Sequence, residues 1–158
     1  MAFLRFVMLL ALVVWIGGII FFAFVLAPTV FSVLPTRHLA GQVVNRSLHL
    51  LHWIGVVSGI VFLAASMAWS AATSGWAHPL ALRHLLVCLM IALTLTSLFV
   101  VSARMETLRA GMGVIDDISP TDARRLEFNR LHGWSTRLEV AVLVLGLAVL
   151  YLTAPGLE

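Results

Sequence analysis

Two apolar stretches of this chain each carry a row of polar side chains that could bind a ligand. Asn45, His49 and His52 are separated by four and three residues, so on a helix they share one face. A second row has the same helical spacing and runs through Phe128, Asn129, His132, Ser135, Thr136 and Glu139. On the stretch between them, Thr94, Ser97 and Arg104 approximate a third row. We expect these rows to face one another, because an ionisable side chain is costly against lipid.

These residue types suit several kinds of chemistry. Imidazoles and a carboxylate are ligands for zinc, copper or iron, which makes His49, His52, His132 and Glu139 a candidate metal set. If the two helices face each other across a bundle, His52 and His132 are candidate axial ligands of a haem. Histidine also titrates near neutral pH, so the same groups could relay protons.

Further polar residues accompany the histidines in this layer. Asn45, Asn129 and Ser135 lie on the same helix faces. Arg104 and Arg130 are close in sequence order to the layer and could neutralise a carboxylate or phosphate group of a ligand. If the layer binds a ligand, that ligand could be a cofactor, either a transition metal or a haem, or an anionic molecule.

The same side chains also fit a structural role. Hydrogen bonds between membrane helices are worth about 0.6–2 kcal/mol each, enough to fix the register of a bundle. His38, His78 and His84 lie in or beside expected loops, and we assign them no role. The single cysteine, Cys88, lies in an apolar run and is expected to pack as a small hydrophobic residue. No motif of soluble catalysis is present, so the sequence does not indicate an enzyme.

The composition shows what must position these residues. The chain has 158 residues, of which 61% are hydrophobic and only 11% charged. Soluble domains are about 25% charged, so most of this surface is expected to contact lipid. The sequence predicts one all-α membrane domain over residues 1–158, an up-down-up-down four-helix bundle. The expected spans are residues 3–27, 44–72, 80–103 and 120–154.

The ends of the expected spans carry turn and cap signals. The first span is expected to stop at Pro28, and a turn is expected from Gly75 to Pro79. Ser119 followed by Pro120 predicts an N-cap with proline at the first helical position. The fourth helix would then have an amphipathic extension in the cytoplasm before it enters the membrane. Gly55 and Gly59 have the spacing that lets another helix approach closely.

The arginines predict the orientation. Eight of the ten basic residues flank one end of the expected bundle, and only Arg5 and Arg83 flank the other. Positive residues concentrate on the cytoplasmic side, so both termini are expected outside. His52, Arg104 and His132 each lie about 20 residues from the outer end of their span, close to the length that crosses the hydrocarbon layer. The polar layer should therefore open towards the cytoplasm.

The arginines also bear on the partners. Because they flank apolar segments and form no single basic face, nucleic acid is not expected as a partner. The expected partners are the lipid bilayer, with a homo-oligomer as a further expectation. The expected location is a bacterial inner membrane.

Several segments resemble the transmembrane protein 205-like family. They are Trp15-Ile16-Gly17-Gly18 with Pro28 and Phe31, Ala103-Arg104 with Glu106, and the run from Phe128 to Ser135. That family consists of four-helix membrane proteins without an agreed activity, so the resemblance implies an architecture more than a function. The first helix is also similar to copper-resistance D-like proteins and to haem-carrying membrane protoporphyrinogen oxidases. This second likeness favours a metal or haem.

Three functions remain open from the sequence. The first is a binding protein that holds a metal ion or haem in the polar layer. The second is a subunit of a transporter or channel for a small solute, a proton or an ion, with the same layer on its path. The third is a membrane scaffold without a ligand.

Overall fold

Helices make up nearly all of the structure, a computed structural model that describes residues 2–74, 81–113 and 118–154. The first rod consists of α1 (Ala2–Phe21), the π-helical segment η1 (Phe22–Leu26) and α2 (Ala27–Val33). The second is α3 (Arg37–Ser74). The third consists of α4 (Leu82–Thr96), the π-helical segment η2 (Ser97–Ser102) and α5 (Ala103–Met112), and the fourth is α6 (Ala123–Thr153).

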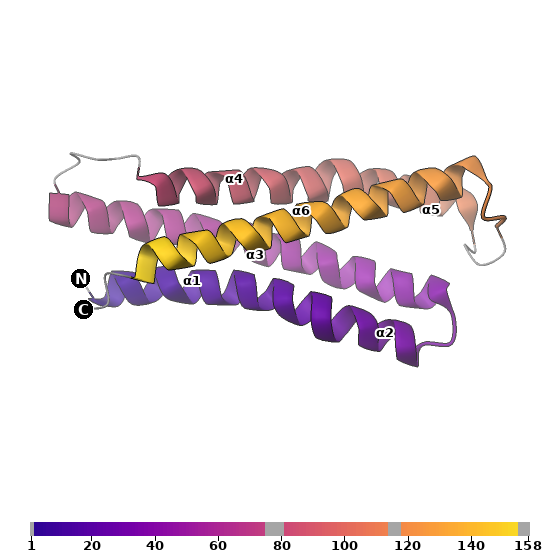
Figure 1. Cartoon of the computed structure of the whole chain (residues 1–158), viewed down its shortest axis with the longest axis horizontal. Helices are drawn as coiled ribbons and strands as arrows, with labels where there is room; N and C mark the ends of the chain where they lie inside the picture. Colours follow the sequence, from indigo (N-terminus) through magenta and orange to yellow (C-terminus); the bar gives the residue numbers. More distant parts are fainter. Residues whose placement is uncertain (1, 75–80, 114–117, 155–158) are drawn as a thin grey trace.

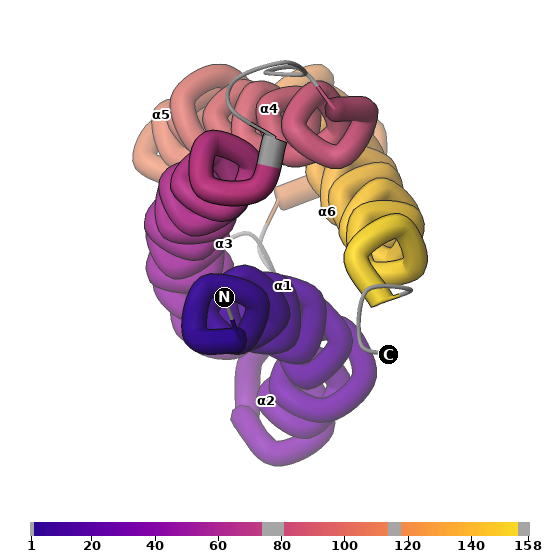
Figure 2. The backbone as a smooth tube through the Cα atoms, turned by 90° about the vertical axis from the view of Figure 1, so that its left-hand side faces the viewer, coloured from indigo at the N-terminus to yellow at the C-terminus, as the bar shows by residue number. Residues whose placement is uncertain are grey.

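The four rods lie side by side, and successive rods run in opposite directions (Figure 1). In the end-on view of Figure 2, α1, α3, α4 and α6 follow one another around the bundle. Each of these packs against the next, and α6 packs against α1. α3 and α6 therefore face each other across the middle, which is where their polar rows can meet.

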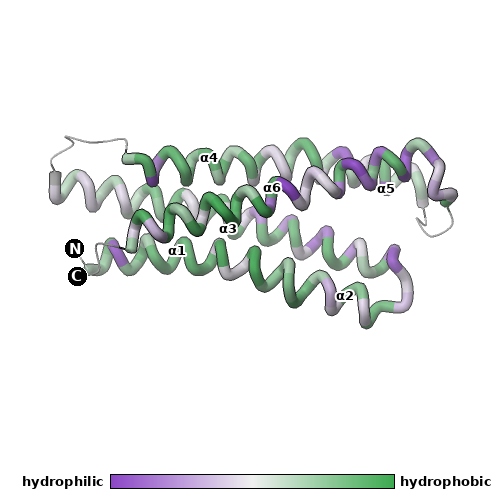
Figure 3. The backbone as a smooth tube through the Cα atoms, viewed as in Figure 1, coloured by the Kyte–Doolittle hydropathy of each residue, from purple (hydrophilic) through white to green (hydrophobic). Residues whose placement is uncertain are grey.

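All four rods are long and apolar enough to cross a membrane, which confirms the prediction of four spanning helices. Large apolar side chains cover the outside: Phe24 is 72% exposed and Tyr151 77%. The hydrophilic residues gather at the end formed by α2, α5 and the start of α6 (Figure 3). The surface thus has the pattern of a lipid-facing bundle with one strongly polar end.

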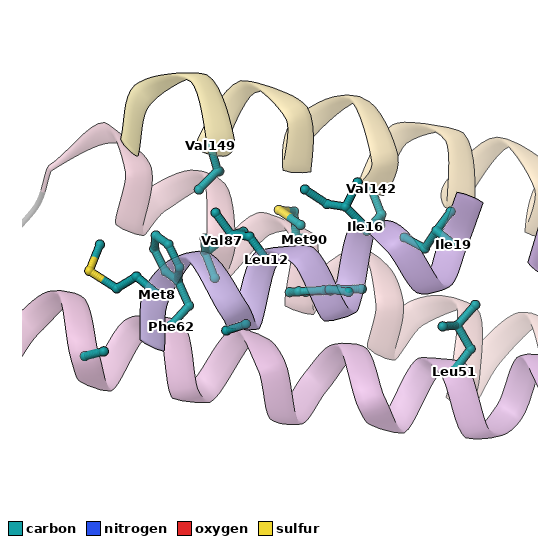
Figure 4. Close-up of a cluster of buried hydrophobic side chains, with 13 residues drawn as sticks. Met8, Leu12, Ile16, Ile19, Leu51, Phe62, Val87, Met90, Val142 and Val149 are labelled. Carbon is teal, nitrogen blue, oxygen red and sulfur yellow. The ribbon is translucent and has the colours of Figure 1, made fainter. Parts of the chain in front are cut away.

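The apolar core lies in the other half of the bundle (Figure 4). Leu12, Met90 and Val149 are almost completely buried there and come from three different rods. Trp15 fills the space above the two glycines of α3: an added Cβ would lie 2.3 Å from its Nε1 at Gly55 and 2.9 Å from its ring at Gly59. The predicted close approach at these glycines is therefore present: α1 makes it at Gly55, and both α1 and Ile91 of α4 make it at Gly59.

The first rod does not end where the sequence predicts. Helix continues through Pro28 to Val33, beyond the expected end at residue 27. Proline has no N–H and its ring crowds the carbonyl of the residue four positions earlier. The chain accommodates this by widening the turn before it, where the Ala27 N–H donates to the Phe22 carbonyl. A π-helical turn replaces the expected break.

The other helix ends also differ from prediction. α3 begins at Arg37 instead of residue 44, and the third rod extends to Met112 instead of 103. Ser119 is not the N-cap of the last helix: Asp122 is, and its side chain accepts a hydrogen bond from the Arg124 N–H. A helix can extend beyond the segment that spans the membrane, because outside the bilayer water hydrates its polar side chains. The predicted turn at residues 75–79 and His78 lie outside the described residues.

Candidate functional site

A cavity of about 610 Å³ opens between all four rods at the polar end of the bundle. Its walls are largely apolar and come from Ile19, Phe22, Phe24, Ala27, Phe31, Val44, Leu48, Met105, Phe128, Val140 and Leu143. Its polar lining comprises Arg37, His38, Asn45, Ser102, Arg109, Arg125, Asn129, His132, Ser135, Thr136 and Glu139. We call it the arginine-rimmed cavity. Its volume is in the range typical of small-molecule sites, about 300–1,000 Å³.

The deepest polar contact joins the two helices that face each other. His52 Nε2 of α3 lies 2.5 Å from Glu139 Oε1 of α6. His52 is 2% exposed, and the Glu139 side chain, 16% exposed, forms part of the cavity lining. An ionised carboxylate only accepts hydrogen bonds, so the Nε2–H donates. His52 Nδ1 is buried and has no hydrogen-bond partner in the described part of the chain.

The cavity brings together five of the predicted polar residues. Asn45, Asn129, His132, Ser135 and Glu139 all line it. The prediction that the rows on α3 and α6 face each other is confirmed by these residues and by the His52–Glu139 contact.

The other predicted residues lie elsewhere. His49 accepts a hydrogen bond from Trp53 Nε1 at 3.3 Å and lines a separate, smaller pocket of about 350 Å³ with Arg46 and Glu106. Arg104 pairs with Glu127 at 2.9 Å on the surface. Arg130 is exposed and is not among the lining residues. Neither Arg104 nor Arg130 is among the residues that line the arginine-rimmed cavity, and their place beside the histidines stays a prediction.

The predicted metal ligands do not converge on one point. Within residues 2–74, 81–113 and 118–154 no group of three or more His, Cys, Asp or Glu side chains is placed to hold a metal ion. Only His52 and Glu139 touch, and their contact uses the Nε2 atom that would coordinate a metal. The binding of a metal or haem stays a prediction.

The rim of the cavity was not predicted. Arg37, Arg109 and Arg125 contribute three guanidinium groups to it, and the guanidinium carbon of Arg109 lies 5.4 Å from the ring centre of Phe128. Arg125 also donates to the Ile118 carbonyl. One signal was available, since Arg125 precedes Phe128 and Asn129 by three and four residues and so extends their row by a turn.

Both π-helical segments border this region. Phe22, Ala23 and Phe24 of η1 line the cavity, and so does Ser102 of η2. π-Helical turns are rare and are frequently found at functional sites. For η1, Pro28 was the residue in the sequence that could have indicated a widened turn. In η2 the buried Ser97 hydroxyl has no hydrogen-bond partner among the described residues, and nothing in the sequence indicates a widened turn there.

A second polar cluster, also unpredicted, lies at the opposite end of the bundle. Ser66 Oγ is 2.7 Å from His84 Nε2 and 3.0 Å from Arg83 Nε, and both Ser66 and His84 are buried. Arg83 Nη2 also donates to Ser70 Oγ at 3.3 Å. His84, for which no role was predicted, is therefore part of a buried network between α3 and α4.

Residues 10–113 match the model of a protein family, a domain of unknown function (DUF4149). The chain belongs to the DUF4149 family. No curated protein and no solved structure matches it. The comparisons name neither the transmembrane protein 205-like family nor the copper-resistance D-like proteins.

The matched region covers the first rod from residue 10 onwards and the next two rods of this DUF4149 protein, and it leaves out α6. The family model thus includes His52, Arg37 and Arg109. It does not include His132, Glu139 or Arg125, and nine of the 24 lining residues come from outside the matched region.

Proposed function

We propose that this DUF4149 protein is an integral membrane protein that binds an amphiphilic ligand in the arginine-rimmed cavity. The ligand would have an apolar body and at least one acidic group. The observation that carries this proposal is the composition of the lining, which is largely apolar and includes three arginines.

The chemistry of the lining supports that ligand class. Burial of apolar surface contributes about 25 cal/mol per Å², so a chain or ring system is favoured against the aromatic and aliphatic wall. Guanidinium groups bind carboxylates and phosphates through paired hydrogen bonds. Among the described lining residues, Glu139 is the one carboxylate, and it is already in contact with His52. The rim therefore has an excess of positive charge for an acidic headgroup.

The proposal includes an orientation. With eight arginines at the cavity end and Arg5 and Arg83 at the other, the rim faces the cytoplasm and both termini lie outside. The ligand would enter from the cytoplasmic leaflet or from the cytoplasm of a bacterial cell. A homo-oligomer is compatible with this placement, since the cavity lies inside one chain.

The test is recovery of the ligand. Protein purified in mild detergent would be extracted and its acidic amphiphiles quantified by mass spectrometry. We expect near-stoichiometric recovery from the wild type and an affinity loss of at least about a hundredfold in Arg109→Gln/Arg125→Gln, since charged hydrogen bonds contribute about 1.5–3 kcal/mol each. Arg104→Gln is the matched control, because Arg104 is exposed and pairs with Glu127. Equal recovery from all three proteins would refute the proposal.

Haem is one ligand of this class, with an apolar macrocycle and two carboxylates. His132 is the histidine that would ligate its iron, because it lines the cavity while His52 Nε2 contacts Glu139. A Soret absorption band in the purified protein, lost in His132→Ala and kept in His49→Ala, is the expected result. Colourless protein from haem-sufficient cells would exclude haem, and metal analysis of the same sample would test a bare metal ion.

The His52–Glu139 contact favours a second candidate function, proton-linked transport through the cavity. A titratable pair between facing helices, at the cavity wall, is the arrangement that proton-coupled carriers use. In proteoliposomes, a pH gradient should drive uptake of the recovered ligand, and Glu139→Gln should abolish the coupling. Uptake by Glu139→Gln at the wild-type rate would count against this function.

A further inference from the structure

The end of the bundle opposite the cavity has two arginines on one aromatic ring. The guanidinium carbons of Arg5 and Arg83 lie 5.4 and 5.2 Å from the ring centre of Trp69. The three residues come from α1, α4 and α3. We call them, with Ser66 and Ser70, the Trp69 cluster. We propose that the Trp69 cluster binds the phosphate group of a membrane phospholipid.

The charge of the cluster is not balanced by the described chain. Within that part of the chain the carboxylates are Glu106 on α5, Asp122 at the N-cap of α6, and Glu127 and Glu139 on α6. α5 and the start of α6 lie at the end of the bundle opposite the N-terminus (Figure 1). The first turn of α4, beside Arg83, contains no acidic residue either. Two like charges on one ring repel each other, and the cation–π contacts offset only about 0.5–2 kcal/mol each. An anion between them would remove that repulsion.

Free hydrogen-bond donors are present to receive it. Arg5 has no hydrogen-bond acceptor in the described residues, so its five N–H groups are available. Arg83 uses Nε for Ser66 and Nη2 for Ser70, which leaves further N–H groups on the same fork. A phosphate oxygen accepts readily from such groups, since charge-assisted hydrogen bonds are about twice as strong as neutral ones.

The network around Ser66 holds Arg83 in position before any ligand arrives. The Ala81 N–H donates to His84 Nδ1 at 3.2 Å, so the proton of the neutral ring sits on Nε2. His84 Nε2–H then donates to Ser66 Oγ at 2.7 Å, and the same oxygen accepts from Arg83. A guanidinium fixed in this way loses less conformational entropy on binding than a free one.

The surroundings favour a lipid over a free phosphate. Phe3 and Phe6 of α1 are 73% and 59% exposed, and Leu82 and Leu85 of α4 are 60% and 63% exposed. These four apolar side chains flank the two arginines in sequence and would lie against acyl chains. A soluble anion would gain nothing from them, whereas a phospholipid would gain burial of its chains next to the bound phosphate.

Native mass spectrometry of the detergent-purified full chain tests the proposal. With phosphatidylglycerol added, we expect the wild type to bind the lipid. Its affinity should fall about fivefold in Arg5→Gln and again in Arg83→Gln, because each basic residue contributes about 1 kcal/mol to the binding of an anionic lipid. The matched control is Arg137→Gln, because Arg137 lies 5.2 Å from the ring centre of Trp134 and is also an arginine on a tryptophan. Arg5→Gln breaks no described hydrogen bond, so it reports on binding even if Arg83→Gln fails to fold.

The outcomes are distinct from those at the cavity. Unchanged lipid binding in Arg5→Gln, or an equal loss in Arg137→Gln, would overturn the site. Competition by millimolar inorganic phosphate alone would overturn the lipid assignment in favour of a free anion. Neither result would affect the ligand recovered from the arginine-rimmed cavity, whose rim residues are all different.

Discussion

At the scale of single residues, the buried polar contacts depend on pairing that the sequence cannot specify. Helical spacing places His52 and Glu139 on interior faces, and both are found there. That they touch each other, while His49 bonds to Trp53, follows from the relative rotation and height of α3 and α6. The relative rotation and height of these helices are set by packing around Trp15 and the core. The periodicity of residues along a single helix carries no information about either. His84 shows the same limit, because its partner Ser66 lies on a different rod.

The contact between His52 and Glu139 should stabilise the fold, and a double-mutant cycle measures this. His52→Ala leaves a carboxylate at the cavity wall without its donor, and we expect it to lower the free energy of unfolding by about 1–3 kcal/mol. Glu139→Ala removes the acceptor from the other side of the same contact and completes the cycle. Unfolding in mixed micelles of the two single variants and the double variant should give a coupling of about 0.6–2 kcal/mol. Strictly additive losses would mean that the contact contributes no stability.

At the scale of the helices, propensity and pattern predicted that four rods exist but not where each ends. A proline such as Pro28 usually marks the end of a helix. Here a π-helical turn precedes it and accommodates the missing hydrogen bond, so the rod continues. Ser119-Pro120 and Asp122 are both good cap sequences, and the choice between them is made by the tertiary position of the preceding chain. The close approach predicted at Gly55 and Gly59 is present, because it depends only on the spacing of two glycines within one helix.

The packing of α1 on α3 should be sensitive to one methyl group at Gly55. A Cβ there would lie 2.3 Å from Trp15 Nε1, so Trp15 or the helix axis must move. We expect Gly55→Ala to reduce the unfolding free energy by about 1–3 kcal/mol, as other overpacked cores do. Gly17→Ala is the control, because nothing lies within 4 Å of its added Cβ. The thermal midpoints of the purified variants give the comparison, and an equal effect of both substitutions would contradict this packing.

The start of α6 should depend on the charge of Asp122. Hydrogen bonds from the side chain and backbone of Arg124 hold the pKa of Asp122 below its ordinary value of 3.8. A carboxyl whose pKa is lowered by folding stabilises the helix start above that ordinary value, and the contribution is lost as pH falls through the lowered pKa. Amide hydrogen exchange of residues 123–127 should therefore accelerate, relative to the intrinsic rate, on acidification below about pH 4. Asp122→Asn keeps a cap without the charge, so the pH step should be smaller in this variant, and what remains should come from Glu127, whose pKa is lowered by its hydrogen bond with Arg104.

At the scale of the whole molecule, composition alone identified a four-helix membrane protein, because apolar content decides the solvent of a surface regardless of how helices pair. The cavity was not predictable in this way. Its walls combine residues from all four rods, and its three arginines come from α3, α5 and the start of α6. The sequence could place a polar layer at one end of the bundle, but not the space that this layer encloses.

The asymmetry of the two ends leads to a prediction for the intact protein in cells. With eight arginines at the cavity end and two at the other, the cavity end should stay in the cytoplasm. A phosphatase that is active only outside the cytoplasm should therefore be active when fused after Glu158 and inactive when inserted at Pro35, between α2 and α3. Green fluorescent protein at the same two positions should give the opposite pattern. If phosphatase activity appeared only at Pro35, the bundle would be inverted, and the ligand of the arginine-rimmed cavity would then have to come from outside the cell.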